Sequence, residues 1–259
     1  MKIRLLAWNA FGSLVRDKLI VVICAAFACV VLFMMSPILM FKSMASTASQ
    51  QQTMVLGLVT LITSFVSGFG SMLAAWASAA AVANEIKSGT ILAVMARPVQ
   101  RWEFLLGKLL GVQILMALYV VLMLVLTLVL TAIGGTHVRG ILWPLLVYPM
   151  FRYALYSTIA LLLVTRMHPV LAFAVVMVCG AIASATSPGS GLIPGAIQQP
   201  LYYVLPSFGL LSESRFLMIS QAELKGLPWT HHLTVLTYGL DWAVVFFLLA
   251  AWSFRRRAL

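Results

Sequence analysis

Long apolar stretches decide the fold of this chain, and residues 109–133 read LLGVQILMALYVVLMLVLTLVLTAI, without a charged side chain. A helix rises about 1.5 Å per residue, so about 20 apolar residues cross the roughly 30 Å hydrocarbon core of a bilayer. This stretch is therefore predicted to span a membrane. Similar runs occur at residues 19–41, 54–83, 141–165, 169–186 and 233–254. The sequence predicts an all-α membrane protein with six transmembrane helices, forming a single domain over residues 1–259.

The composition excludes an ordinary soluble domain. Hydrophobic residues make up 63% of the 259 residues and charged residues 9%, whereas soluble domains average roughly 45–50% and about 25%. The net charge of +11 does not indicate nucleic-acid binding, because the basic residues lie between apolar runs and form no single stripe. The three cysteines, Cys24, Cys29 and Cys179, all lie within apolar stretches, which is typical of small buried side chains.

The distribution of Lys and Arg predicts the orientation in the membrane. With six spans, most basic residues fall on one side: Lys2, Arg4, Arg16, Lys18, Lys87, Arg97, Arg101, Lys108, Arg166, Arg255, Arg256 and Arg257. The other side holds Lys42, Arg139, Arg215 and Lys225. Because basic loops stay in the cytoplasm, both termini are predicted to be cytoplasmic, in a bacterial inner membrane.

Three further segments have recognisable patterns. Residues 2–18 have apolar side chains at roughly helical spacing and a basic polar face, which predicts an amphipathic helix on the inner leaflet; a merely basic leader is the alternative. Residues 54–83 include Gly70, Ala74 and Ser78 at four-residue spacing, so this span is expected to pack closely against other helices. The outer segment, residues 187–232, is rich in proline and is expected to form short interfacial helices.

Residues 84–108 form the predicted cytoplasmic loop between spans two and three. Gly89 interrupts one helical stretch, and Thr90 can cap a short apolar helix after it. Pro98 disfavours helix at Arg97 and fits the first turn of the next helix. An apolar surface helix flanked by charges is expected to dock into a partner protein or into the lipid headgroup layer.

The loop resembles that of the type-2 ABC exporter permeases, the membrane subunits of ATP-driven exporters. The matching residues are Glu85, Gly89, Thr90, Pro98, Val99, Arg101, Phe104, Gly107 and Lys108. The resemblance implies that residues 84–103 are the coupling region that binds an ATPase subunit, and that the turn Arg166–Pro169 is a second, smaller contact. It implies as coupling residues Glu85, Gly89, Thr90, Arg97, Pro98, Arg101, Gly107 and Lys108. It also implies two ATPase copies, and a second permease subunit, identical or related.

The chain is not expected to hydrolyse ATP. A phosphate-binding loop requires Gly-Lys followed by Ser or Thr, and Gly107-Lys108 is followed by Leu109. ATP and magnesium are therefore assigned to the partner ATPase, and no cofactor to this chain. Two other function classes stay open. One is a membrane assembly or signalling factor that uses an ATPase without bulk transport. The other, less favoured, is an intramembrane enzyme, because the sequence contains no Gly-x-Ser-x-Gly, His-Glu-x-x-His or paired-aspartate motif.

Two ionisable residues lie within predicted spans, Arg152 in span four and Asp241 in span six. Each is 14 positions before an arginine at the cytoplasmic end of its span, so their similar depth and opposite sign suggest an intramembrane pair. The alternative is that each side chain extends separately to the outer interface.

Several side chains near the outer ends of spans one and six are of types that bind soft metals. Arg97-Pro98-Val99 resembles the permeases of copper-linked nitrous-oxide reductase maturation systems, and candidate ligands are His231 and His232 with Met34, Met35, Met40 and Met44. No His or Cys cluster has ligand spacing, so no metal site is predicted. The apolar spans favour lipid-like, peptide or drug-like cargo over a bulky polysaccharide.

Overall fold

The computed structural model describes residues 2–16, 48–87, 100–133, 143–185, 206–212 and 228–256. The regular elements in this part of the chain are helices: α1 (Lys2–Val15), α3 (Ala48–Lys87), α5 (Arg101–Ile133), α6 (Trp143–Val164), α7 (Pro169–Ala185) and α10 (Trp229–Arg255). The prediction of an all-α protein is confirmed. The predicted first span, residues 19–41, lies outside the described residues.

Among the described residues, four helices are long and apolar enough to cross a membrane: α5, α6, α10 and, within α3, Gly57–Glu85. α7 has 17 residues, about 26 Å, close to the shortest length that spans a bilayer. α5, α6 and α7 contain or nearly coincide with three of the predicted spans. The chain is therefore a multi-pass membrane protein.

Helix α10 starts earlier than the predicted boundary at residue 233. Pro228 occupies its N-cap with an extended backbone, and the helix begins at the next residue. Proline suits this position because the first N–H groups of a helix have no partner within it. His231 and His232 consequently lie in the first turns of α10.

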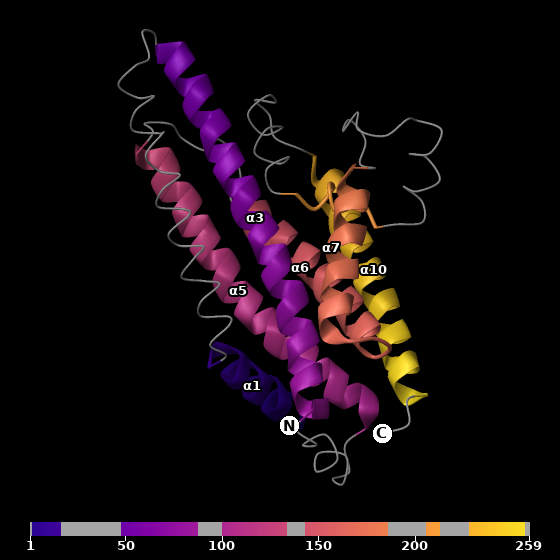
Figure 1. The fold of residues 1–259 in the computed structure, drawn as a ribbon. Helices are drawn as coiled ribbons and strands as arrows, with labels where there is room; N and C mark the ends of the chain where they lie inside the picture. The colour runs from indigo at the N-terminus through magenta and orange to yellow at the C-terminus, as the bar shows by residue number, and fades with distance from the viewer. Residues whose placement is uncertain are drawn as a thin grey trace.

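Helix α6 lies at the centre of the bundle. It packs against α3, α5, α7 and α10, while α3 crosses diagonally over α5 and α6 (Figure 1). α1 packs mainly against the first turns of α5, at the end of the molecule where α10 finishes (Figure 1). We call this end, which holds Glu85, Arg101 and Arg255, the base.

The small residues of α3 allow the close packing that the sequence predicts. Ala74 and Ser78 are fully buried. A Cβ atom added to Gly70 would lie 2.4 Å from the Tyr153 hydroxyl of α6, so the two helices approach at a distance that excludes a side chain. In the most apolar stretch of α3, 61% of the residues are buried, against 17% in α10.

The described part of the outer segment, residues 206–212, packs into the protein core. Residues 206–212 form turns rather than an interfacial helix. Phe208 and Leu211 are buried, and the Phe208 ring stacks on Tyr156 of α6 at 4.4 Å. The Ser207 backbone N–H donates to the Tyr238 hydroxyl of α10 at 2.7 Å. This segment therefore fills space between α6 and α10, because its apolar side chains have a protein core within reach.

Candidate coupling site at the base of the bundle

Half of the predicted coupling residues fall in the described part of the chain. Gly89, Thr90, Arg97 and Pro98 lie outside the described residues. The other predicted residues, Glu85, Arg101, Gly107 and Lys108, are brought together at the base, where α3 ends and α5 begins. The coupling role of all eight residues stays a prediction.

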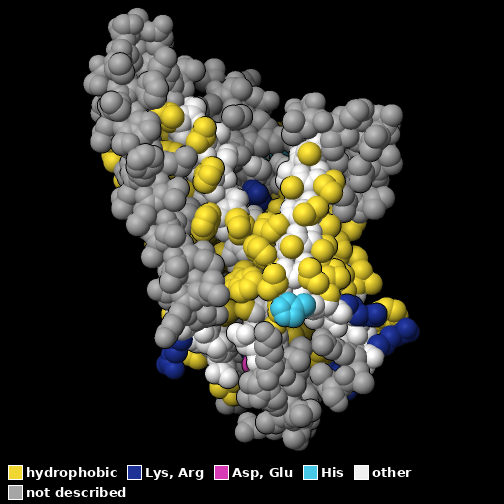
Figure 2. All heavy atoms as spheres, viewed as in Figure 1, with side chains coloured by type: hydrophobic (Ala, Val, Ile, Leu, Met, Phe, Trp, Pro, Cys, Tyr) yellow, Lys and Arg dark blue, Asp and Glu magenta, His cyan; other side chains and the backbone are white. Residues whose placement is uncertain are grey.

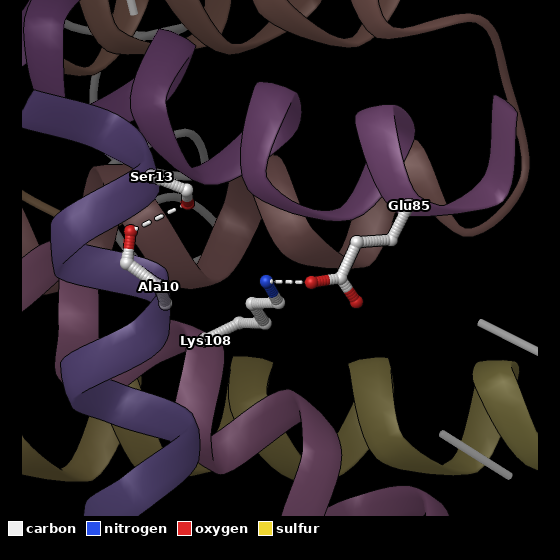
Figure 3. Close-up of polar contacts among 4 residues, drawn as sticks. All are labelled: Ala10, Ser13, Glu85 and Lys108. Atoms are coloured by element: carbon white, nitrogen blue, oxygen red, sulfur yellow. Dashed lines mark hydrogen bonds and ion pairs between the residues drawn. The ribbon is translucent and has the colours of Figure 1, made fainter. Parts of the chain in front are cut away.

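An ion pair joins the two helices that flank the loop. Lys108 Nζ of α5 donates to Glu85 Oε1 of α3, and the two side chains point toward each other (Figure 3). The Lys108 side chain is 5% exposed and the Glu85 side chain 23%. The ammonium also lies 5.8 Å from the centre of the Phe104 ring, within the range of a cation–π contact. A charge this deeply buried requires its partner, so α3 and α5 are fixed to each other here.

Helix α1 covers the same turns of α5. A Cβ atom added to Gly107 would lie 2.6 Å from Leu6 Cβ, and one added to Gly111 would lie 2.6 Å from Ala10 Cβ. The glycine predicted from the loop motif therefore provides the space in which α1 packs. Figure 3 shows α1, with its Ser13 to Ala10 hydrogen bond, beside the Glu85–Lys108 pair. On the opposite face of α1, Trp8 is 67% exposed.

The start of α5 is also fixed to the end of α10. Arg101 Nη1 donates to the carbonyl oxygens of Phe254 at 3.3 Å and Arg255 at 3.0 Å. These are among the last carbonyls of α10, where a cation is favoured because a helix C-terminus carries partial negative charge. Glu103 Oε2 accepts from the backbone N–H of Gln100 at 2.9 Å, which caps the first turn of α5.

The turn between α6 and α7 contacts the same helix end. Arg166 Nε donates to Ser253 Oγ at 2.8 Å, and the Thr165 hydroxyl lies 2.8 Å from the same atom. The two segments that the resemblance implies as ATPase contacts are thus both bonded to the last turn of α10. The sequence did not predict a role for Ser253, because a single serine within an apolar run belongs to no motif that indicates a contact with another helix end.

The structure does not join the two charges predicted within the spans. Arg152 Nη1 donates to Ser67 Oγ of α3 at 2.8 Å. Asp241 is exposed on α10, and no ion pair links it to Arg152 in the described part of the chain. A pairing between them stays a prediction without support in this arrangement.

The two histidines at the start of α10 differ in exposure, because His231 is partly exposed and His232 is buried. His232 is buried, its Nδ1 lies 2.6 Å from the Tyr148 hydroxyl, and its ring centre lies 4.8 Å from that of Trp143. Within the described ranges, no group of three or more His, Cys, Asp or Glu residues could hold a metal ion. The four candidate methionines lie outside those ranges. His232 therefore serves to pack α6 against α10.

The fold and the base together define a multi-pass membrane protein whose helix ends are joined by charged side chains at one end. A sequence profile described as ABC-2 family transporter protein matches residues 4–259. The chain belongs to this family, whose members generally work with an ABC ATPase partner. No curated protein matches the chain. The resemblance of Arg97-Pro98-Val99 to the copper-linked permeases stays a prediction.

Proposed function

We propose that this chain is the permease subunit of an ATP-driven exporter in the bacterial inner membrane, and that it couples hydrolysis by a separate ATPase to movement of its spans. The observation that carries the proposal is the convergence of contacts at the base. The Glu85–Lys108 pair fixes both helices that flank the loop, and Arg101 and Arg166 fix the loop and the turn to one end of α10.

The physical consequence is that a force on the loop reaches several spans at once. An ATPase that pushes on residues 88–99 moves the ends of α3 and α5 together, because a buried ion pair resists separation. Arg101 passes the same displacement to α10, and α10 passes it to the turn at Arg166. The base faces the cytoplasm in this proposal, since basic residues are concentrated there.

The assembly contains two copies of the ATPase and a second permease subunit, identical or related. The resemblance implies this assembly, because a subunit with six spans normally forms only half of the pathway. Movement at the base would then change how Phe208 and its neighbours close the opposite end. Export rather than import is inferred from the family resemblance of residues 84–108.

Co-purification from native membranes tests the proposal. Three tagged chains are compared: the wild type, a variant with residues 89–99 replaced by a Gly-Ser sequence of equal length, and a control with residues 215–225 replaced in the same way. The wild type and the control are expected to retain an ABC ATPase, and the loop variant to lose it. If the wild type retains no ATPase in a detergent that preserves other ABC complexes, the coupling proposal is wrong and the intramembrane-enzyme class returns.

Coupling itself is tested with Arg101→Gln in the complex reconstituted in lipid vesicles. The variant is expected to bind the ATPase as the wild type does, while ATP hydrolysis responds less to the presence of the permease. Arg16→Gln, which removes an exposed cation at the end of α1, serves as the control for the loss of one charge. An unchanged response in Arg101→Gln contradicts the proposed transmission through α10.

A further inference from the structure

Two exposed tryptophan–arginine pairs lie at the base, on helices far apart in the sequence. Arg4 and Trp8 form the first pair, which we call the α1 pair, and both side chains are exposed. Trp252 and Arg256 form the second, the α10 pair, in which the guanidinium carbon lies 4.0 Å from the centre of the tryptophan ring. Each pair has a spacing of four residues, about one helical turn, so its members are neighbours on one face. Trp8 is 67% exposed and Trp252 51%, so neither ring belongs to the core of the chain.

Both pairs lie at the level where the apolar surface of the spans ends. The exposed residues of α5 begin at Leu110, and all of them are apolar. Helix α1 packs against α5 at Gly107 and Gly111, within one turn of that boundary. On α10, Trp252 is the last exposed apolar residue before the exposed arginines at the helix end. Figure 2 shows basic side chains gathered on both sides of this lower end, below the hydrophobic side chains of the spans.

The two residue types suit the lipid headgroup layer. Tryptophan is enriched at membrane interfaces, because its ring is apolar and its N–H can donate to polar groups. Arginine has an apolar stem, and its planar fork of N–H donors matches two oxygens of a phosphate. Residues 2–18 contain four Lys or Arg against one acidic residue, Asp17, so the charge of this segment is complementary to anionic headgroups. Leu5, on the same face as the α1 pair, is 66% exposed, and an apolar face with such cations is typical of a helix in the membrane interface.

We propose that the base lies in the headgroup layer and that the α1 pair and the α10 pair each bind an acidic phospholipid, through its phosphate group. The opposite face of α1 packs on Gly107 and Gly111 of α5, beside the Glu85–Lys108 pair (Figure 3). A lipid bound at the α1 pair therefore holds α1 against the start of α5 and stabilises the base. That the base is cytoplasmic rests on the proposed function; that it binds acidic lipid does not.

Native mass spectrometry of the purified full-length chain in a neutral detergent tests the binding. The probes are dioleoyl phosphatidylglycerol and dioleoyl phosphatidylcholine, which carry the same chains, while only the first has a net negative headgroup. The wild type is expected to bind phosphatidylglycerol more tightly by about fivefold at each pair, the usual contribution of one basic residue near an acidic membrane surface.

Variants assign the preference to the two pairs. Arg4→Gln and Arg256→Gln should each remove one preferred phosphatidylglycerol, and the double variant should bind both probes equally. Both arginines are exposed, so the variants should keep the helical circular dichroism of the wild type. Arg16→Gln is the matched control and should keep the preference. It removes another exposed cation of the same segment, but no tryptophan lies within four residues of it and Asp17 follows it.

Thermal unfolding in the same detergent tests the effect on the base. A ligand that binds the folded state stabilises it, so phosphatidylglycerol should raise the midpoint of the wild type more than phosphatidylcholine does. The extra rise should be smaller in Arg4→Gln and unchanged in Arg16→Gln. An equal rise with both lipids in the wild type would show that acidic lipid does not stabilise the base.

Three results would overturn the lipid sites: equal binding of the two probes by the wild type, the same preference in the double variant, or an equal loss of preference in Arg16→Gln. If Arg4→Gln instead loses a co-purifying ATPase and keeps its preference for phosphatidylglycerol, the exposed face of α1 binds that protein and not lipid. The lipid measurements use neither ATPase nor transport. A failure of ATPase co-purification therefore leaves them unaffected, and equal binding of the two probes leaves the proposed coupling unaffected.

Discussion

The Glu85–Lys108 pair should show asymmetric costs when either charge is removed. Glu85→Gln leaves an ammonium with a 5% exposed side chain, and removing one partner of a buried pair costs about 3 kcal/mol of unfolding free energy or more. Lys108→Met leaves a carboxylate that is 23% exposed and partly solvated, so a cost of about 1–2 kcal/mol is expected. The double variant leaves no uncompensated charge and should cost about 1 kcal/mol, well below the sum of the single costs.

Equilibrium unfolding of the purified chain in mixed micelles, with increasing dodecyl sulfate and circular dichroism as the readout, measures these costs. Arg16→Met, which removes an exposed cation, is the control and should change the unfolding free energy by less than about 0.5 kcal/mol. Equal costs for the two single variants, or a double variant that equals their sum, would refute the reasoning that burial and pairing determine the stability of the base.

Three further outcomes are expected. Gly111→Ala should lower the midpoint of micelle unfolding, with a steric cost of about 1–3 kcal/mol, because the added Cβ atom would lie 2.6 Å from a Cβ atom of α1. The control Gly12→Ala, where nothing lies within 4 Å of the added atom, should raise the midpoint, since alanine favours helix. A change in the same direction in both variants would contradict the close packing of α1 on α5. Phe208→Ala should destabilise the chain by about 3 kcal/mol, because its ring is buried against Tyr156; a change below about 1 kcal/mol in the same assay would show that these turns are not part of the core. Asp241→Asn should leave the unfolding free energy unchanged or raise it, because the carboxylate is exposed on an apolar helix; a marked loss of stability would instead support a pair with Arg152.

The sequence predicts the spans well because a bilayer imposes a simple length rule on apolar runs. α6, at Trp143–Val164, differs by one or two residues from the prediction of 141–165. The start of α10 was four residues earlier than predicted, because Pro228 and not hydropathy determines where that helix begins. A window of apolar residues does not detect a helix that continues into polar sequence.

The coupling residues were predicted by type but their partners were not. Glu85 and Lys108 are 23 positions apart, and Arg101 reaches carbonyls more than 150 positions away. Contacts of this kind depend on which helix ends meet in space, and the spacing of residues along one chain does not contain that information. The same limit applies to Arg152: its unusual position was evident from the sequence, but its neighbours Ser67 and Tyr156 were not.

The length of α3 has a geometric consequence. Its 40 residues extend for about 60 Å, twice the roughly 30 Å thickness of the hydrocarbon core, and one end is fixed at the base by Glu85. A rigid rod of this length converts a tilt of about 10° at one end into a displacement of about 10 Å at the other. α3 would therefore amplify a movement of an ångström or two near the loop into a much larger one on the far side of the membrane.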